Sequence, residues 1–209
     1  MTELHNTVQG QRSAVIYIIR HGRTEANRQY ILQSRVDNPL SEEGILQAER
    51  ARDWFSEEGI SISAIYSSPL IRALKTGQIV AGDLVPVTLD DRLLEMDYGP
   101  YEGIDLKSPP PEIKNWFGDF VHHPAPEGIE SLSSVVGRAG SFLEDLRKKD
   151  PSGNILIATH AIAMKGFLEY LTPEAGGRYW SKNIRNCDVY MTRLTPEGYT
   201  VPVQVYANR

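Results

Sequence analysis

One short stretch of this chain limits what the rest can be. Residues 14–19 read Ala-Val-Ile-Tyr-Ile-Ile, which is typical of a buried β-strand, and they run directly into Arg20, His21 and Gly22. In α/β proteins, ligands usually bind at the carboxyl ends of such strands. The stretch therefore predicts an α/β fold with a compact anion site at the end of its first strand. Asn27 lies within reach of that point if the residues between are helical.

Strand-like and helix-like segments alternate along most of the chain. The periodicity predicts further strands over residues 60–66, 84–89, 154–159, 187–194 and 200–206. It predicts helices over residues 41–59, 68–81, 132–146 and 164–171. This alternation indicates a three-layer α/β sandwich, in which a mostly parallel central sheet carries helices on both faces.

Two of the predicted helices have recognisable first residues. Ser41 is expected to cap one of them, with Ile45 on its inner face. Ser68 is expected to cap the next, with Pro69 at its first position. Arg72 then falls in the first turn, where free backbone N–H groups and the helix dipole favour an anion.

The chain is expected to form a single domain over residues 1–209, with a loose tail at residues 1–13. The regular pattern breaks at residues 97–127, which are rich in proline and hold one short helix candidate near 112–121. Irregular insertions in compact domains are often functional, so we interpret this one as a cap or lid. Three aromatic residues are expected to pack it onto the body, and one could line a pocket: Trp116, Phe117 and Phe120.

Composition excludes several classes of function. The formal net charge of −5 argues against broad nucleic-acid binding, which needs a basic face. Cys187 is the single cysteine, so the chain forms no internal disulfide, and we expect it to be buried. The polar N-terminal residues do not resemble a signal peptide, and no apolar run reaches membrane-spanning length. We therefore expect a cytoplasmic protein without nucleic-acid or membrane partners.

Three further residues are candidates for chemistry beside His21. His160 follows an apolar strand in the same way, so the two imidazoles would meet if both strands are central and parallel. Arg72 can present its planar guanidinium to a phosphate, and Glu95, among apolar neighbours, is a candidate general acid. Each has a structural alternative: a histidine satisfied by hydrogen bonds, a solvated arginine, a carboxylate in a salt bridge.

Six sequence motifs, which follow one another in a fixed order, span most of the chain. They are R-H-G-x-[ST]-x-x-N at residues 20–27, a block at 37–48, S-S-P-L-x-R-A-x-x-T at 67–76, L-x-E-x-x-x-G-x-x-E-G at 93–103, a near match to P-x-G-E-S at 126–131, and Thr-His at 159–160. R-H-G alone is a weak signal, whereas all six together are specific. The chain resembles the histidine phosphatase superfamily, in the branch that holds cofactor-dependent phosphoglycerate mutase and its phosphatase relatives.

The resemblance implies roles for the site residues. His21 would be the nucleophile and form a phosphohistidine, and Glu95 would protonate the leaving oxygen. The phosphoryl group would be held by Arg20, Asn27, Arg72 and His160, with Arg23 and Thr24 as further candidate contacts. Because guanidinium groups replace a metal in this family, the resemblance implies no metal and no cofactor. The partner would be a small phosphorylated metabolite.

Two positions depart from the mutase pattern. Mutases carry glutamate directly after R-H-G and tryptophan before the asparagine, where this chain has Arg23 and Ala26. We therefore predict a phosphomonoester hydrolase, with Arg23 either attracting a second anionic group or simply solvated. A cofactor-dependent phosphoglycerate mutase and a non-catalytic phosphate-binding regulatory module are the alternatives. The sequence leaves the substrate open, and also whether the terminal strands pair in a homodimer.

Overall fold

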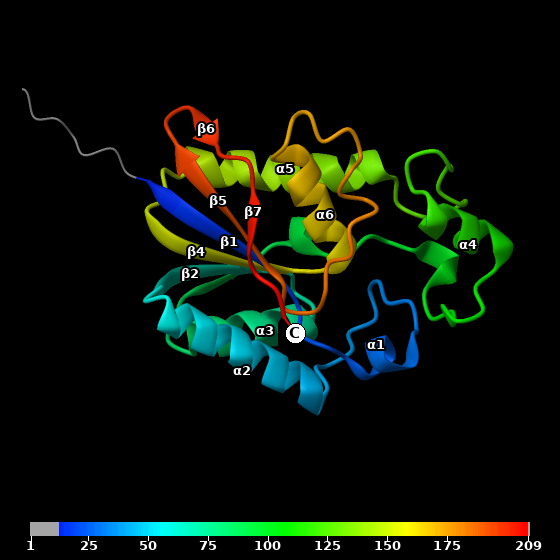
Figure 1. The fold of residues 1–209 in the computed structure, drawn as a ribbon, viewed down its shortest axis with the longest axis horizontal. Coiled ribbons are helices and arrows are strands. Elements are labelled where there is room, and N and C mark those ends of the chain that lie inside the picture. The colour runs from blue at the N-terminus through cyan, green and yellow to red at the C-terminus, as the bar shows by residue number, and fades with distance from the viewer. Residues whose placement is uncertain (1–12, 209) are drawn as a thin grey trace, which may run out of the picture.

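In the computed structural model, residues 13–208 are described, so most of the tail expected at residues 1–13 lies outside the described residues. Within them the central sheet has seven strands in the order β3-β2-β4-β1-β5-β6, and β7 also pairs with β5 (Figure 1). The four mutually parallel strands are β1 (Ala14–Arg20), β2 (Ile62–Ser67), β3 (Val87–Leu89) and β4 (Gly153–Thr159). Strand β5 (Val189–Thr195) pairs antiparallel with β1. The short strands β6 (Gly198–Tyr199) and β7 (Val203–Tyr206) each pair antiparallel with β5.

Helices cover both faces of this sheet, as predicted (Figure 1). Strand β1 alternates between the faces: Ile16 and Ile18 pack on one side, and Tyr17 and Ile19 on the other. The first side is covered by α5 (Leu132–Lys148) and α6 (Ala161–Tyr170), and the second by α2 (Glu42–Glu57) and α3 (Ile71–Ala81). The predicted mixed α/β sandwich is therefore confirmed.

The register between β1 and β4 positions the site. These neighbouring parallel strands pair from Ala14 with Gly153 through Arg20 with Thr159. Both strands therefore end at the same level, and the residue after each, His21 and His160, emerges at one edge of the sheet. The sequence indicates that each histidine follows a strand, and the direct pairing of β1 with β4 makes the two strand ends adjacent.

The predicted start of α3 is wrong. Helix α3 begins at Ile71 with Leu70 as its N-cap, whereas Ser68 directly follows β2 and Pro69 lies in a bend. The Ser68 hydroxyl lies 2.8 Å from Nε2 of His160 and accepts the N–H of Leu70 at 3.3 Å, but no N–H of the helix itself. Instead the carboxylate of Asp37 accepts the Ile71 N–H at 2.7 Å.

Two expected apolar positions are exposed. Ile45 is 41% exposed, because α2 turns Gly44 and Gln47 inward and brings its backbone close to the chain at residues 22–23. Leu84 is 99% exposed, and the third strand covers only Val87–Leu89 instead of residues 84–89. Helical and strand periodicity therefore identified these elements but not every inward-facing residue.

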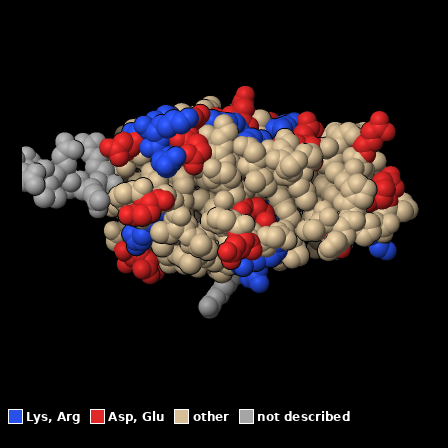
Figure 2. Space-filling view, turned by 90° about the horizontal axis from the view of Figure 1, so that it is seen from above, with Lys and Arg blue, Asp and Glu red and all other residues tan. Residues whose placement is uncertain are grey.

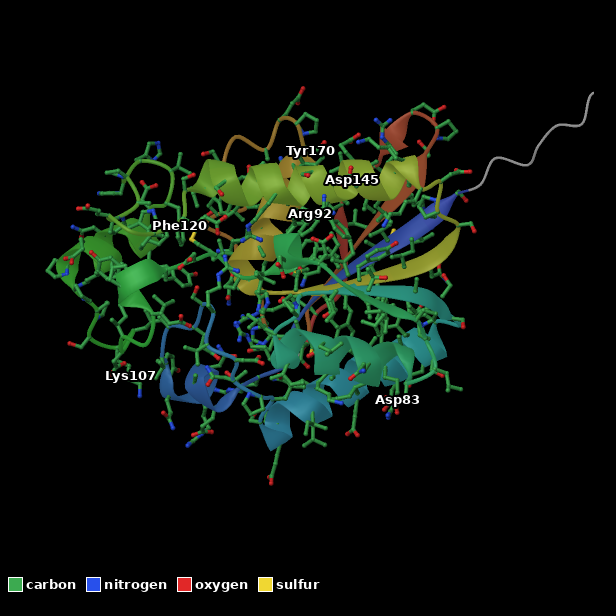
Figure 3. All side chains as sticks on the ribbon, turned by 180° about the vertical axis from the view of Figure 1, so that it is seen from behind. Asp83, Arg92, Lys107, Phe120, Asp145 and Tyr170 are labelled. Carbon is green, nitrogen blue, oxygen red and sulfur yellow. The ribbon has the colours of Figure 1, made fainter. Side chains whose placement is uncertain are left out.

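Residues 97–127 form irregular structure around two short helices, η2 (Gly99–Tyr101) and α4 (Pro111–Gly118), and follow the turn η1 (Asp91–Leu93). Trp116 and Phe120 are buried in a cluster that includes Ile162 of α6, so the aromatic residues pack the segment onto the body as expected. Figure 3 shows Phe120 on the side of this segment that faces α5, and Lys107 at its lower edge, where Nζ lies 5.0 Å from the centroid of the Tyr30 ring. Backbone hydrogen bonds join the segment to residues 30–32, which follow α1 (Glu25–Gln29).

The face seen from above carries acidic and basic side chains interspersed around broad uncharged areas (Figure 2). Among residues 13–208, no helix combines the length and the apolar character that crossing a membrane requires.

Candidate active site

Two histidines lie side by side at the carboxyl edge of the sheet. His21 follows β1 and is 4% exposed, and His160 follows β4 and is fully buried. Their ring centroids are 5.1 Å apart, at an interplanar angle of 62°. The pairing expected from their shared strand-end context is therefore present.

The hydrogen bond of His21 selects its tautomer. Nδ1 lies 2.7 Å from the carbonyl oxygen of Gly22, and a carbonyl oxygen only accepts hydrogen bonds. The proton therefore sits on Nδ1, which leaves the lone pair on Nε2. Gly22 is itself held by Thr76, whose Oγ1 accepts its N–H at 3.0 Å. A side chain at Gly22 would collide with the carbonyl group of Gly44 in α2.

Burial and nearby cations keep both imidazoles neutral. Burial lowers the pKa of His21 well below 6.5, and the charges of Arg20 and Arg72 lower it further. The hydrogen bond to the Gly22 carbonyl acts in the opposite direction and raises this pKa. Burial likewise lowers the pKa of His160, with Arg72 as the next largest cause. At neutral pH, His21 therefore has an unprotonated Nε2 beside two guanidinium groups.

Backbone carbonyls hold both arginines. Arg72 is fully buried and donates to the carbonyl oxygens of Val36 at 2.9 Å and Ser34 at 2.8 Å. Arg20 donates to the carbonyl oxygen of Ile184 at 2.6 Å. Within the described residues, three buried nitrogens of this cluster have no hydrogen-bond partner: Nε of Arg20, Nε of Arg72 and Nδ1 of His160. A phosphate would bring several acceptor oxygens to a cluster with unmet donors.

The loop that holds Arg72 is clamped from its other side by Glu102. Oε1 of Glu102 accepts the backbone N–H groups of Ser34 at 2.6 Å and Val36 at 2.9 Å. The same two residues therefore give their carbonyls to Arg72 and their amides to Glu102. The sequence motif contained Glu102, but only the fold shows that it faces this loop.

Glu95 lies at the amino end of α6. Its Oε1 accepts the N–H groups of Met96 at 2.8 Å, Ala163 at 3.0 Å and Ile162 at 3.1 Å, whereas Oε2 accepts Ile162 alone, at 3.2 Å. The surroundings are thus backbone amides as well as the apolar neighbours expected from the sequence. Oε2 keeps the greater free capacity to exchange a proton with a bound ligand.

Asn27 is held so that its amide nitrogen remains to donate. Its Oδ1 accepts the Thr24 N–H at 3.2 Å and Nδ2 of Asn186 at 3.3 Å. Asn186 also donates to the backbone oxygen of His21 at 2.9 Å. Sequence reasoning missed Asn186, because it stands in an irregular loop before β5 with no local pattern to mark it.

The structure does not bring Arg23 and Thr24 into the cavity. Thr24 caps α1: its hydroxyl donates to Gln33 at 2.9 Å and accepts the Asn27 N–H at 3.1 Å. The Arg23 backbone binds the Gln47 side chain at 2.9 Å. Thr24 therefore contacts the site through Asn27 and Gln33, which both line the cavity.

These groups open into a cavity of about 170 Å³. Its polar end is formed by Arg20, His21, Asn27, Arg72 and Glu95, while His160 lies beside His21 and does not line the cavity. The remaining wall comes from the loop after α1, from residues 97–127 and from the start of α6: Ile31, Leu32, Gln33, Tyr98, Leu106, Phe117, Ala161 and Ile162. Of the three aromatic residues expected to pack this segment onto the body, Phe117 is thus the one that lines the pocket.

A family model described as the histidine phosphatase superfamily (branch 1) matches residues 16–205. The chain belongs to this superfamily. It is 29% identical to phosphoserine phosphatase 1 of Hydrogenobacter thermophilus, over 79% of this chain and 80% of that protein. It is 30% identical to phosphoglycerate mutase-like protein 4 of Arabidopsis thaliana, over 93% and 85%.

Solved structures of histidine phosphatases share the fold. Phosphoserine phosphatase of Entamoeba histolytica in complex with 3-phosphoglyceric acid has a TM-score of 0.77 and 26% identity, covering 94% of this chain and 97% of that one. The predicted family and phosphatase class are therefore confirmed, and names of both phosphatase and mutase type occur among the relatives.

Proposed function

We propose that this chain hydrolyses a small phosphomonoester through a phosphohistidine on His21. One observation carries the proposal: the Nδ1 proton of His21 is bound to the Gly22 carbonyl oxygen, so the free lone pair is on Nε2. A nucleophile needs such a lone pair held in one orientation. Arg20 and Arg72, which line the same cavity, are placed to bind the phosphoryl oxygens.

In the first step, Nε2 of His21 attacks phosphorus and the bond from phosphorus to the ester oxygen breaks. The negative charge on the transferring group is spread over its oxygens, where guanidinium groups stabilise it. Glu95 gives its proton to the departing alkoxide, which leaves as an alcohol. The site then holds a phosphohistidine and a Glu95 carboxylate.

In the second step, a water molecule attacks the phosphohistidine. Glu95 takes a proton from the water, the bond from phosphorus to Nε2 breaks, and inorganic phosphate leaves. Residues 97–127 supply Tyr98, Leu106 and Phe117 to the cavity wall, which supports a role for this segment as a lid over the site. We place the enzyme in the cytoplasm as a single domain.

A phosphoglycerate mutase would pass the same phosphoryl group to a second substrate hydroxyl. The test supplies 3-phosphoglycerate with 2,3-bisphosphoglycerate and follows 2-phosphoglycerate and free phosphate. Hydrolysis predicts that 2-phosphoglycerate does not form rapidly, and that free phosphate is released from p-nitrophenyl phosphate assayed in parallel. Interconversion without phosphate release would overturn the proposal in favour of the mutase.

The nucleophile is tested with His21→Ala. We expect turnover of p-nitrophenyl phosphate and the acid-labile phosphoenzyme both to disappear. His122→Ala is the matched control, because His122 is an exposed histidine whose ring binds Asp119, outside the cavity. Survival of either signal in His21→Ala would refute the mechanism. Phosphate binding without any turnover in the unaltered protein would instead favour the regulatory module.

A further inference from the structure

Resting on the proposed function, we infer that the alcohol released from the substrate is short and uncharged, with an apolar surface close to the ester oxygen. The structure points away from amino-acid and carboxylic-acid esters such as phosphoserine and 3-phosphoglycerate. The inference comes from what lines the cavity beyond its phosphate-binding end.

That part of the wall is mainly aliphatic and aromatic. Ile31 and Leu32 come from the loop after α1, Leu106 and Phe117 from the segment 97–127, and Ile162 from the first turn of α6. Leu32 and Ile162 are buried, and the other three are half-buried. An alcohol that fills this space exchanges water for apolar contact.

The two polar side chains on this wall carry no charge. The Oε1 atom of Gln33 already accepts hydrogen bonds from Thr24 at 2.9 Å and from Asn38 at 3.1 Å. Burial raises the pKa of Tyr98 well above 10, so its hydroxyl stays neutral at physiological pH. They can hydrogen-bond an alcohol, but neither can neutralise an ion.

Among residues 13–208, all the charged groups that line the cavity belong to its polar end. They are Arg20, Arg72 and Glu95, and each has a task there: the arginines bind phosphate, and Glu95 exchanges the proton of the ester oxygen. A carboxylate or ammonium two or three bonds from that oxygen would face the apolar wall without a counter-ion. Burying an unpaired charge is strongly unfavourable, so such substrates should react slowly.

Size adds a second restriction. The cavity of about 170 Å³ must hold the phosphoryl group together with the alcohol. An alcohol of a few carbon atoms matches this volume, and longer ones have to extend out of the cavity. A charge on a longer substrate would therefore be tolerated only beyond the cavity mouth.

Matched substrate pairs test the inference. Glycerol 3-phosphate differs from 3-phosphoglycerate by a hydroxymethyl group in place of the carboxylate, and isobutyl phosphate has methyl groups where phosphoserine has its two charges. We expect kcat/KM to be at least about tenfold higher for the uncharged member of each pair. Equal values, or a preference for the charged members, would overturn the inference and leave the hydrolase intact. Failure to hydrolyse these esters and p-nitrophenyl phosphate would overturn both.

A cation placed on the wall should weaken the preference for uncharged esters. Leu106→Lys is expected to raise the ratio of kcat/KM for 3-phosphoglycerate over glycerol 3-phosphate by about tenfold or more. Leu84→Lys, at a position that is 99% exposed, is the control for added charge and should leave the ratio unchanged. Phe117→Arg provides a second variant if Leu106→Lys does not fold. An unchanged ratio in a folded wall variant would contradict the inference.

Discussion

Oε1 of Glu95 accepts the backbone N–H of Ala163 at 3.0 Å, which fixes the carboxylate at the amino end of α6, the helix that follows His160. Two further amides, those of Met96 and Ile162, bind the same oxygen. The side chain therefore has one position from which it can reach the ester oxygen of a bound substrate. An acid in this place matters most when the leaving group is poor.

Glu95→Gln should consequently slow the enzyme in a way that depends on the substrate. With isobutyl phosphate we expect kcat to fall by about 10²–10⁴, because the alkoxide leaves without a proton. With p-nitrophenyl phosphate, whose leaving group needs no proton, the burst of p-nitrophenol from phosphoenzyme formation should survive. Rapid-quench kinetics measure both, and an equal loss of the first step for the two esters would contradict this role.

Removal of Glu102 should disturb Arg72 without unfolding the protein. Glu102→Ala removes the acceptor for the Ser34 and Val36 amides, so the carbonyls that orient Arg72 become less ordered. We expect kcat/KM to fall by about tenfold or more, with partial rescue in Glu102→Gln, which keeps one acceptor oxygen. Glu112→Ala, at an exposed site, is the control. Equal activity of Glu102→Ala and Glu112→Ala would contradict the positioning role.

The close approach of α2 to the nucleophile loop predicts a large difference between two glycine substitutions. Gly22→Ala would press a methyl group against the Gly44 carbonyl and should destabilise the protein by about 1–3 kcal/mol or more. Gly137→Ala, in α5 with open space around it, should stabilise by about 0.5–1 kcal/mol. Urea denaturation measures both, and similar effects for the two would contradict the packing described.

His21 and His160 should remain neutral at pH values at which an ordinary histidine is protonated. Their pKa values lie well below 6.5, so below that pH the unfolded chain binds protons that the folded chain does not, and stability contributed by these groups is lost as pH falls. Imidazole NMR signals, assigned with His21→Ala and His160→Gln, should show the neutral form at about pH 6. Midpoints at or above the ordinary value would contradict the electrostatic description.

Lys165 provides a separate dependence on pH. It is 9% exposed, donates to the Trp180 carbonyl at 2.7 Å, and burial lowers its pKa to about 8. Because the unfolded pKa is about 10.4, the folded state gains stability relative to the unfolded state as pH rises from about 8 to 10.4. The difference in unfolding free energy between the wild type and Lys165→Met should therefore rise by up to about 3 kcal/mol over that range.

Denaturation at several pH values measures this difference, since titrations shared by the two proteins cancel. Lys148→Met is the control, because Lys148 is an exposed lysine paired with Asp145. A pH-independent difference for Lys165→Met would show that the ammonium is not destabilised in the folded protein.

The sequence by itself determined the order of elements and the placing of the two histidines. The run of β-branched and aromatic residues that predicts β1 is a local signal, and the structure has Ile16 and Ile18 on one face with Tyr17 and Ile19 on the other. The charged residue and glycine that end such a strand are also local signals. Hydrophobic periodicity relates residues two to four positions apart, so it is present in the sequence itself.

Tertiary structure alone decided which partners the polar groups have. Ser68 looked like a helix cap, but the fold brings it to His160, 92 positions away, and a hydroxyl binds the group it meets. Thr24 looked like a phosphate ligand, but its hydroxyl is used by Gln33 and Asn27. Hydrogen bonds are short and directional, so their partners depend on distances that only the folded chain defines. Long-range geometry of this kind turned one arginine–histidine strand end into a site with an oriented imidazole.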